Sequence, residues 1–337
     1  MKRVSGIKPI DNLVVPELLY GKRLSFEGGG SGVRAIVVQD GILQKDSIYR
    51  IKPVSWEELS EWVGWIDEKE KPICKDITTA GVFSQDGVVI ESPNLEWLKG
   101  HNLCELFRSF CNDLIGAVTG EMYCDEGIIK GISNGVFETI GFGWGGVNIR
   151  EGVIYKSEPG HKFAGPGLAD VPCGCKRDGC KEGVYSGGGV AKQVIAMAYH
   201  YFGIKPDSEG NINGLDPCQW LDTEARAGRE WALEYYLWLA EGIGHTWADI
   251  LNGSESIEIV GFMGSFITFG MEFMKETILN TMLKQAMFPV HREALEQQIQ
   301  TGEETILIRS KLWNKECPGN SFMGAAIYGE LSYQGLI

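Results

Sequence analysis

One histidine and three cysteines lie close together in residues 158–183, a segment rich in glycine and proline. His161 is followed by Cys173, Cys175 and Cys180, in the spacing C-x-C-x4-C. Three thiolates and one imidazole complete a tetrahedral Zn²⁺ shell and leave no position for a catalytic water. Redox pairs usually have the spacing C-x-x-C, and a reducing compartment disfavours disulfides. We therefore expect a structural zinc site, with free thiols as the alternative.

Two carboxylates flank this cluster. Glu158 precedes His161 by three residues, and Glu182 follows Cys180 by two. A loop held by a metal is a rigid carrier for such side chains, and carboxylates accept hydrogen bonds from the hydroxyl groups of a ligand. The alternative is a solvated acidic loop, and these residues alone leave both interpretations open.

Residues 22–40 and 136–149 share one pattern, an apolar strand, a glycine-rich turn and a second apolar strand. The turns Gly28–Gly32 and Gly141–Gly146 have few Cβ atoms, so backbone N–H groups can approach a phosphate closely. Hairpins also use glycine, and the chain has no G-x-x-x-x-G-K-[ST] motif. The repetition suggests a duplicated unit that holds phosphate between its halves.

A third candidate is the pair Asn112-Asp113, which precedes a run of small residues. An aspartate near the start of a helix usually caps it. The functional alternative is a general base, and nothing nearby in the sequence decides between the two.

Helix and strand patterns alternate around these candidates, which predicts an α/β fold. The sequence predicts a helix at 55–70, with Ser55 as N-cap and Glu58 as its capping-box partner. A helix is also expected at the start of 101–121, and two within 221–251, broken near Gly242. The other predicted elements are helices at 186–202 and 267–285 and strands at 77–83, 257–262 and 305–310.

The composition limits the kinds of partner. The chain has 337 residues and a formal net charge of −14. Nucleic acids and anionic membranes are bound by clustered basic side chains, so neither is expected as the main partner. The nine cysteines lack the spacing of a secreted disulfide scaffold, and no signal peptide or membrane span is readable. We therefore expect a cytoplasmic protein.

Taken together, these motifs resemble the ROK family of sugar kinases, repressors and related proteins. The resemblance runs from about residue 22 to the end of the chain. Its motifs follow one another in family order: G-G-S after an acidic residue (27–31), S-P-N-L with Trp97 (92–97), N-D (112–113), G-x-G-x-G-G (141–146), E-x-G-H (158–161), C-x-C-x4-C-x-E (173–182) and M-G-A-A (323–326).

The resemblance implies a two-domain, actin-like (ribonuclease H-like) α/β sugar kinase fold with an inter-domain cleft. A small domain is expected over residues 1–115, with a C-terminal helix in 312–337 packing back on it. A large domain is expected over 116–311, including the zinc loop 158–182. The implied reaction transfers the γ-phosphoryl group of ATP, with Mg²⁺, to a hydroxyl of a hexose or N-acetylhexosamine. The partners are then a sugar and a nucleotide, in a homodimer or homotetramer.

The same resemblance assigns roles to individual residues. Asp113 is the expected general base, and His161 both binds zinc and faces the sugar. The implied sugar-binding residues are Asn94, Asn112, Asp113, Gly145, Glu158, His161 and Glu182. The implied nucleotide-binding residues are Glu27, Gly29, Gly30, Ser31, Gly141, Gly143, Gly261 and Gly264.

Several residues depart from the family pattern, mainly on the nucleotide side. Glu27 stands where the family has Asp, Phe142 replaces the Thr of G-T-G, and Trp144 is bulkier than usual. Lys176 replaces a Gly inside the zinc loop. One alternative is therefore a sugar-binding ROK protein with weak or no kinase activity, and another is a kinase with a different phosphate donor. A repressor is not expected, because about 25 residues precede the first motif, too few for a winged helix-turn-helix.

Overall fold

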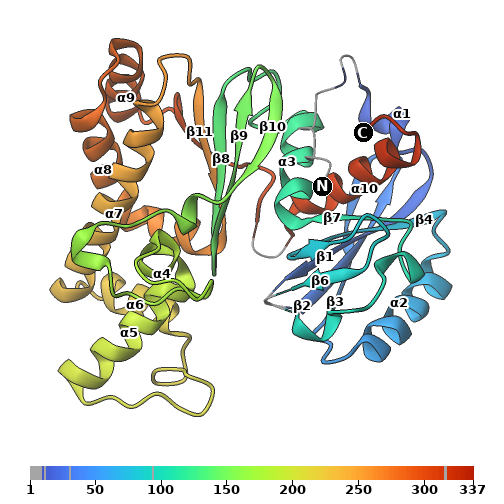
Figure 1. Cartoon of the computed structure of the whole chain (residues 1–337), viewed down its shortest axis with the longest axis horizontal. Coiled ribbons are helices and arrows are strands. Elements are labelled where there is room, and N and C mark those ends of the chain that lie inside the picture. Colours follow the sequence, from blue (N-terminus) through green and yellow to red (C-terminus); the bar gives the residue numbers. More distant parts are fainter. Residues whose placement is uncertain (1–9, 11–12, 30–31, 93–94, 315–316) are drawn as a thin grey trace. The chain divides into compact units, whose positions relative to one another are not determined.

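The computed structural model describes residues 10, 13–29, 32–92, 95–314 and 317–337. The chain divides into two compact units (Figure 1). The first unit comprises Met1–Ile132, Gly152–Tyr155 and Ser310–Ile337, and the second comprises Ser133–Glu151 and Lys156–Arg309. Among the described residues, no helix combines the length and apolar character that a membrane span requires.

The first unit contains a five-stranded sheet with helices on both faces. Its strands are β1 (Lys22–Gly29), β2 (Gly32–Gln39), β3 (Ile42–Ile51), β4 (Cys74–Thr79) and β7 (Ser109–Asn112), with a separate two-stranded ribbon of β5 (Val82–Phe83) and β6 (Val89–Glu91). Its helices are α1 (Val15–Leu18), α2 (Trp56–Glu70), α3 (Asp113–Tyr123) and α10 (Gly319–Tyr333), with 3₁₀ turns at Glu96–Leu98 and Leu103–Glu105.

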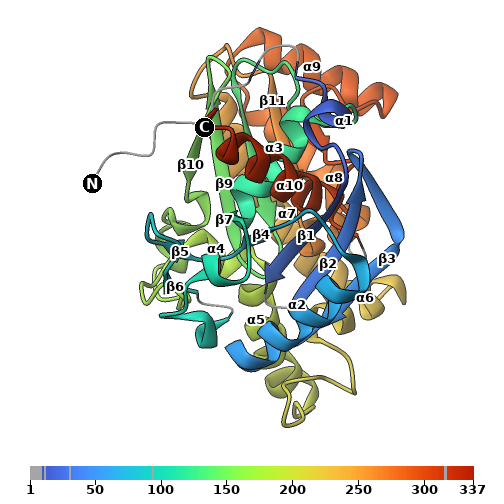
Figure 2. The ribbon, with the colours of Figure 1, turned by 90° about the vertical axis from the view of Figure 1, so that its right-hand side faces the viewer.

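In this sheet the strand order is β3-β2-β1-β4-β7. β1 pairs antiparallel with β2 and parallel with β4, and β4 pairs parallel with β7. Leu24 and Phe26 of β1 are buried against α2, whereas the alternate residues Arg23 and Ser25 face α10. Helices α3 and α10 lie side by side on that second face in both views (Figures 1 and 2). The period of two along β1 thus places one apolar and one polar row on opposite faces.

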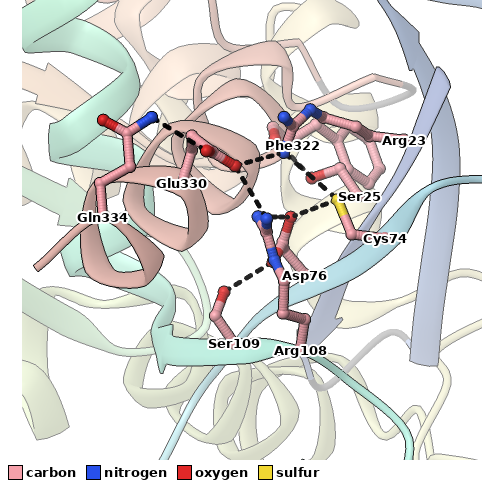
Figure 3. Close-up of polar contacts among 9 residues, drawn as sticks. All are labelled: Arg23, Ser25, Cys74, Asp76, Arg108, Ser109, Phe322, Glu330 and Gln334. Atoms are coloured by element: carbon pink, nitrogen blue, oxygen red, sulfur yellow. Dashed lines mark hydrogen bonds and ion pairs between the residues drawn. The ribbon is translucent and has the colours of Figure 1, made fainter. Parts of the chain in front are cut away.

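A charged network connects α10 to the polar face of the sheet (Figure 3). Both carboxylate oxygens of Asp76, a fully buried residue of β4, accept hydrogen bonds from Arg108 at 2.9 and 3.1 Å. Nη1 of Arg108 and Nη1 of Arg23 each donate to Glu330 of α10 at 2.8 Å. Each charged group of this network therefore has an oppositely charged partner, which a buried ion pair requires.

The second unit repeats the arrangement with a larger helical layer. Its sheet is made of β8 (Gly135–Ile140), β9 (Trp144–Arg150), β10 (Val153–Ser157), β11 (Ile259–Met263) and β12 (Leu307–Arg309), although residues 153–155 of β10 are counted with the first unit. Its helices are α4 (Lys181–Tyr185), α5 (Gly187–Phe202), α6 (Pro217–Arg226), α7 (Glu230–Leu251), α8 (Ser265–Gln285) and α9 (Pro289–Thr301), with 3₁₀ turns at Pro159–His161 and Pro166–Leu168.

The two sheets have the same topology. The order in the second sheet is β10-β9-β8-β11-β12, so β8 takes the place of β1 at the centre. β8 pairs antiparallel with β9 and parallel with β11, as β1 does with β2 and β4. Both glycine-rich turns predicted from the sequence therefore connect the central strand to its antiparallel neighbour. The predicted α/β class is confirmed.

The helix predicted at the start of 101–121 is wrong. Leu103–Glu105 forms a 3₁₀ turn, residues 109–112 form β7, and the helix α3 begins only at Asp113. The apolar residues Leu103 and Phe107 are buried, but they reach the core from a turn rather than from a helix face. The strand predicted at 77–83 also ends earlier, at Thr79, and a separate strand, β5, follows.

The predicted helix break near Gly242 is also wrong. The break lies at residues 227–229, where Gly228 has a φ of 72°, and α7 runs without interruption through Gly242. A Cβ atom at Gly242 would lie 2.3 Å from the ring of Tyr185. This glycine therefore allows close packing of an aromatic ring and does not end the helix.

Candidate functional site

The four predicted metal ligands are brought together in the second unit. His161 ends the 3₁₀ turn Pro159–His161, and Cys180 precedes α4. The distances are 3.8 Å from Cys173 Sγ to His161 Nδ1 and 3.6 Å from Cys175 Sγ to Cys180 Sγ, and all four ligand atoms lie within 4.8 Å of one another. Zn–S bonds of about 2.3 Å in a tetrahedron place sulfur atoms about 3.8 Å apart. The cluster therefore has the donors and the dimensions of a structural zinc site.

Backbone hydrogen bonds order the loop around this cluster. Cys173 N donates to Arg177 O at 3.0 Å, and Lys176 N donates to Cys173 O at 3.1 Å. Lys181 N donates to Lys162 O at 2.9 Å, which joins the residues next to Cys180 and His161. These bonds form a tight turn that carries Cys173 and Cys175, without any long helix or strand.

The thiols differ in their ease of ionisation. Burial raises the pKa of Cys175, but hydrogen bonds from the side chain and backbone of Arg177 outweigh burial and bring this pKa to about 6. Burial raises the pKa of Cys173 to about 12, and it also raises that of Cys180. Neighbouring thiolates repel one another, so a divalent cation at the centre is needed to hold all three in the ionised form that binds metal.

We expect purified protein to contain about one zinc ion per chain, because the donor set is that of a Cys₃His structural site. Cys175→Ser should lose the metal and lower the melting temperature. Metal analysis by mass spectrometry, together with thermal unfolding, tests this. As a control, Cys104→Ser changes an exposed cysteine outside the cluster. Protein without zinc above background would contradict the assignment.

Lys176 has a left-handed backbone conformation, with a φ of 67°. Residues with a Cβ atom pay a steric cost there that glycine does not. We expect Lys176→Gly to raise stability by less than about 1 kcal/mol, since glycine also costs entropy in the unfolded chain. Urea unfolding of the zinc-loaded protein measures this. A clear loss of stability would show that the Lys176 side chain contributes contacts of its own.

Glu182, one of the two flanking carboxylates, lies between the zinc cluster and the second glycine turn. Its Oε2 accepts a hydrogen bond from Trp144 N at 2.9 Å, and its Oε1 lies 3.4 Å from Cys173 Sγ. Glu158, the other, is 51% exposed and forms an ion pair with Lys156 at 3.2 Å. The structure therefore fixes Glu182 against the cluster and leaves Glu158 near it in sequence but open to solvent.

The second glycine turn, residues 141–143, is held by the start of α5. Gly187 N donates to Gly141 O at 2.7 Å, and Gly188 N donates to Phe142 O at 2.8 Å. The N-cap Ser186 adds a bond from Oγ to Phe142 O at 2.8 Å. The ring of Phe142 is 72% exposed. Backbone groups at the start of this helix are therefore used to hold the turn, and the turn presents an aromatic ring.

The predicted site glycines of the second unit are Gly141, Gly143, Gly145, Gly261 and Gly264. A Cβ atom at Gly143 would lie 2.9 Å from Glu182 Oε2, so the approach of this carboxylate requires glycine. Gly264 has a φ of 116°, and its Cβ would lie 2.5 Å from Ile140 O. Gly145 lies in β9 and Gly261 in β11, the neighbours of β8 on either side. Gly143, Gly145 and Gly264 therefore lie at the end of β8, where the turn begins, whereas Gly261 pairs with Phe137 within the strand.

In the first unit, Asn112 and Asp113 join β7 to α3. Asn112 is the N-cap, since its Oδ1 accepts from Leu114 N at 3.2 Å, and its Nδ2 donates to Gly81 O at 3.3 Å. Asp113 is the first residue of the helix, so it is not the cap. Because β1, β4 and β7 are parallel, Asp113 lies at the same edge of the sheet as Gly29, the last residue of β1.

Glu27 of β1 has two charged neighbours. It forms an ion pair with Arg34 of β2, with 3.1 Å between Oε2 and Nε. Burial raises the pKa of Glu27, Arg34 opposes this, and the nearby Asp113 carboxylate raises it further. The structure thus places Glu27 and Asp113 close enough to interact. Arg34 was not among the predicted site residues, although its place opposite Glu27 follows from the hairpin register.

Three predicted site residues, Gly30, Ser31 and Asn94, lie outside the described part of the chain. Sequence reasoning also missed Glu138, which lies in the middle of β8 and is 2% exposed. The available signal was a charged residue directly after the apolar pair Val136-Phe137 in the strand segment VFETI.

Solved structures share the fold at low sequence identity. A ROK hexokinase from Thermus thermophilus aligns with a TM-score of 0.68 at 19% identity, covering 93% of this chain and 99% of the other. A ROK family glucokinase from Streptomyces griseus, in complex with glucose and AMPPNP, aligns with a TM-score of 0.66 at 19% identity. The alignment covers 91% of this chain and 98% of the glucokinase. A ROK family transcriptional regulator, a homologue of the E. coli MLC protein, aligns with a TM-score of 0.69 at 18% identity. The alignment covers 94% of this chain and 81% of the regulator.

No curated protein matches the chain at a significant level. The actin-like α/β fold expected from the resemblance is confirmed by the solved structures. The sequence model of the ROK family matches residues 24–298, which is most of the chain. The protein therefore belongs to the ROK family.

Proposed function

We propose that this protein phosphorylates a hydroxyl group of a hexose or N-acetylhexosamine with ATP, and that Asp113 is the general base. The observation that carries the proposal is that Asp113 follows β7 at the sheet edge where β1 ends with Gly29, and that its carboxylate raises the pKa of Glu27. In this assignment Asp113 serves the sugar hydroxyl and Glu27 serves the cation of the nucleotide. Membership of a family that includes sugar kinases supports this assignment.

In this proposal Asp113 accepts the proton of the attacking sugar hydroxyl. Phosphoryl transfer has a loose transition state, so the proton leaves late and a carboxylate with an ordinary pKa is a sufficient base. The start of α3 holds the residue in place, because its neighbour Asn112 caps the helix and bonds Gly81 O. Asn112 would also bind a neighbouring hydroxyl.

The sugar would be held mainly by residues of the zinc region. His161 presents Nδ1 to the cysteine cluster, so a bound metal fixes its tautomer and leaves Nε2 for a sugar hydroxyl. Glu182 and Glu158 would accept hydrogen bonds from hydroxyls near the anomeric carbon. Gly145 and Asn94 complete the proposed set. The zinc does no chemistry in this assignment and acts as a support.

The nucleotide would lie against the glycine-rich turns. Glu27, Gly29, Gly30 and Ser31 form the first proposed group, and Gly141, Gly143, Gly261 and Gly264 form the second. Mg²⁺, when bound, would neutralise charge on the phosphates. Glu27 is the residue proposed to interact with this cation. The glucokinase structure that contains AMPPNP supports an ATP-type donor.

A second candidate function is sugar binding with little or no phosphorylation. Phe142 puts an exposed ring where a phosphate-binding hydroxyl is expected, and Arg34 neutralises part of the charge of Glu27. Both features would weaken nucleotide binding, and neither involves a proposed sugar-binding residue. The similarity to a ROK regulator is compatible with this candidate.

An ADP-release assay over a panel of hexoses and N-acetylhexosamines, paired with calorimetry of sugar binding, separates the two candidates. We expect at least one sugar to stimulate ADP release. Sugar binding without turnover on ATP or on polyphosphate would favour the binding protein. Turnover on polyphosphate alone would change the donor, and neither binding nor turnover would contradict both candidates.

A further inference from the structure

We propose that Trp144 is a positioning residue for the sugar site, and that the buried carboxylate of Glu138 holds its side chain in place. The inference deepens the proposed function and rests on it. It concerns residues of the second unit only, and Glu138 belongs to none of the family motifs quoted above.

Two indole rings share one oxygen of Glu138. Nε1 of Trp144 and Nε1 of Trp247 each donate to Oε2 at 2.9 Å. Glu138 is 2% exposed, and both tryptophans are fully buried. Burial raises the pKa of Glu138, and the two indole N–H groups oppose this.

A buried carboxylate is a costly way to fill this space. Removing such a group from water costs several kcal/mol unless its hydrogen bonds are satisfied, and an apolar residue of similar size is often equally stable. Packing alone therefore does not account for Glu138. A fixed orientation of the two indole rings does, since each N–H has one defined acceptor.

The main chain of Trp144 contacts both parts of the proposed sugar site. Its N–H donates to Glu182 Oε2 at 2.9 Å. Gly160, which lies between Glu158 and His161 in sequence, also packs against Trp144. A Cβ atom at Gly160 would lie 2.3 Å from Trp144 O and 2.7 Å from Trp144 Cβ. A shift of Trp144 would therefore move Glu182 and the turn that carries His161 together.

Trp247 extends this chain of contacts into the helical core. It belongs to α7 and packs against Phe262 of β11, with 5.4 Å between ring centroids. It contacts the same oxygen of Glu138 as Trp144 does, but no hydrogen bond of the described residues links its main chain to Glu182 or to the turn Pro159–His161. The two tryptophans therefore form equal hydrogen bonds to Glu138, but only Trp144 also contacts Glu182 and the turn that carries His161.

The test compares Trp144→Phe with Trp247→Phe. Each removes one indole N–H from the same oxygen and a similar volume from the core, so we expect similar losses in melting temperature. Only Trp144→Phe should weaken sugar binding, by about tenfold, equivalent to about 1.4 kcal/mol or one hydrogen bond to a charged group. The sugar KM should rise by a similar factor while kcat stays within about threefold of wild type, because Asp113 is not displaced.

Two substitutions of Glu138 provide a second, independent arm. Glu138→Gln keeps an oxygen that can accept both indole N–H groups, so sugar affinity should stay near that of wild type. Glu138→Leu removes the acceptor from a site where an apolar residue can pack, so it should fold and reproduce the weakened binding of Trp144→Phe.

Equal effects of Trp144→Phe and Trp247→Phe on sugar affinity would overturn the inference, as would unchanged affinity in both Trp144→Phe and Glu138→Leu. In either case the wild-type protein still binds its sugar, and the proposed function stands. If the wild-type protein binds no sugar of the panel, the proposed function fails and the role of Trp144 fails with it.

Discussion

Replacing Asp113 by asparagine is expected to lower the rate of sugar phosphorylation by about 10²–10⁴-fold, the usual cost of losing a positioned general base. Asparagine has nearly the same shape and cannot accept the hydroxyl proton. The N-cap bond of α3 belongs to Asn112 and is unaffected, so the helix should remain intact. Steady-state ADP release gives the rate, and calorimetry should show sugar affinity close to that of wild type.

Glu57→Gln is a suitable control for Asp113→Asn. Glu57 also lies in the first turn of a helix, α2, and this change removes the same kind of interaction with a helix N-terminus. It should leave turnover unchanged. Full activity of Asp113→Asn would overturn the choice of base, and loss of sugar binding together with turnover would make Asp113 a binding residue instead.

Glu330→Gln is expected to lower the free energy of unfolding of the first unit by about 3–5 kcal/mol, the typical cost of breaking a buried ion pair from one side. Glu330 accepts hydrogen bonds from both Arg23 and Arg108. Without it, Asp76 is the only carboxylate of the network drawn in Figure 3 that remains near the two guanidinium groups. Urea unfolding followed by circular dichroism measures the loss.

Asp125→Asn serves as the control for this stability prediction. Asp125 forms an ion pair with Lys130, but its side chain is 97% exposed, and surface pairs contribute little. The urea midpoint of the Asp125→Asn protein should match that of wild type. A Glu330→Gln protein as stable as this control would show that the network does not hold α10 to the sheet.

The same network predicts a pH dependence. Burial raises the pKa of Glu330, but hydrogen bonds from Arg108, Gln334 and Arg23 outweigh burial and hold this pKa below its ordinary value of 4.5. A group with a lowered folded-state pKa stabilises the protein above its unfolded-state pKa. The contribution of Glu330 should therefore be lost as the pH falls below 4.5, and the stability difference between wild type and Glu330→Gln should shrink there.

Features that depend on neighbouring residues were readable from the sequence. His161, Cys173, Cys175 and Cys180 lie within one short loop, and the structure places their ligand atoms within 4.8 Å. The predicted cap Ser55 accepts a hydrogen bond from Glu58 N. Caps, hairpins and metal loops involve contacts between residues close in the chain, so their residue types and spacing carry most of the information.

Features that depend on register and packing were decided only by the tertiary structure. The start of α3 at Asp113 follows from the pairing of β7 with β4, which overrides the helical pattern of the preceding residues. The network around Glu330 and the bonds of Glu138 join residues up to 307 positions apart. Such partners come together only when sheets and helices have packed. The local sequence around a buried charge does not specify which residue of a distant strand or helix will pair with it.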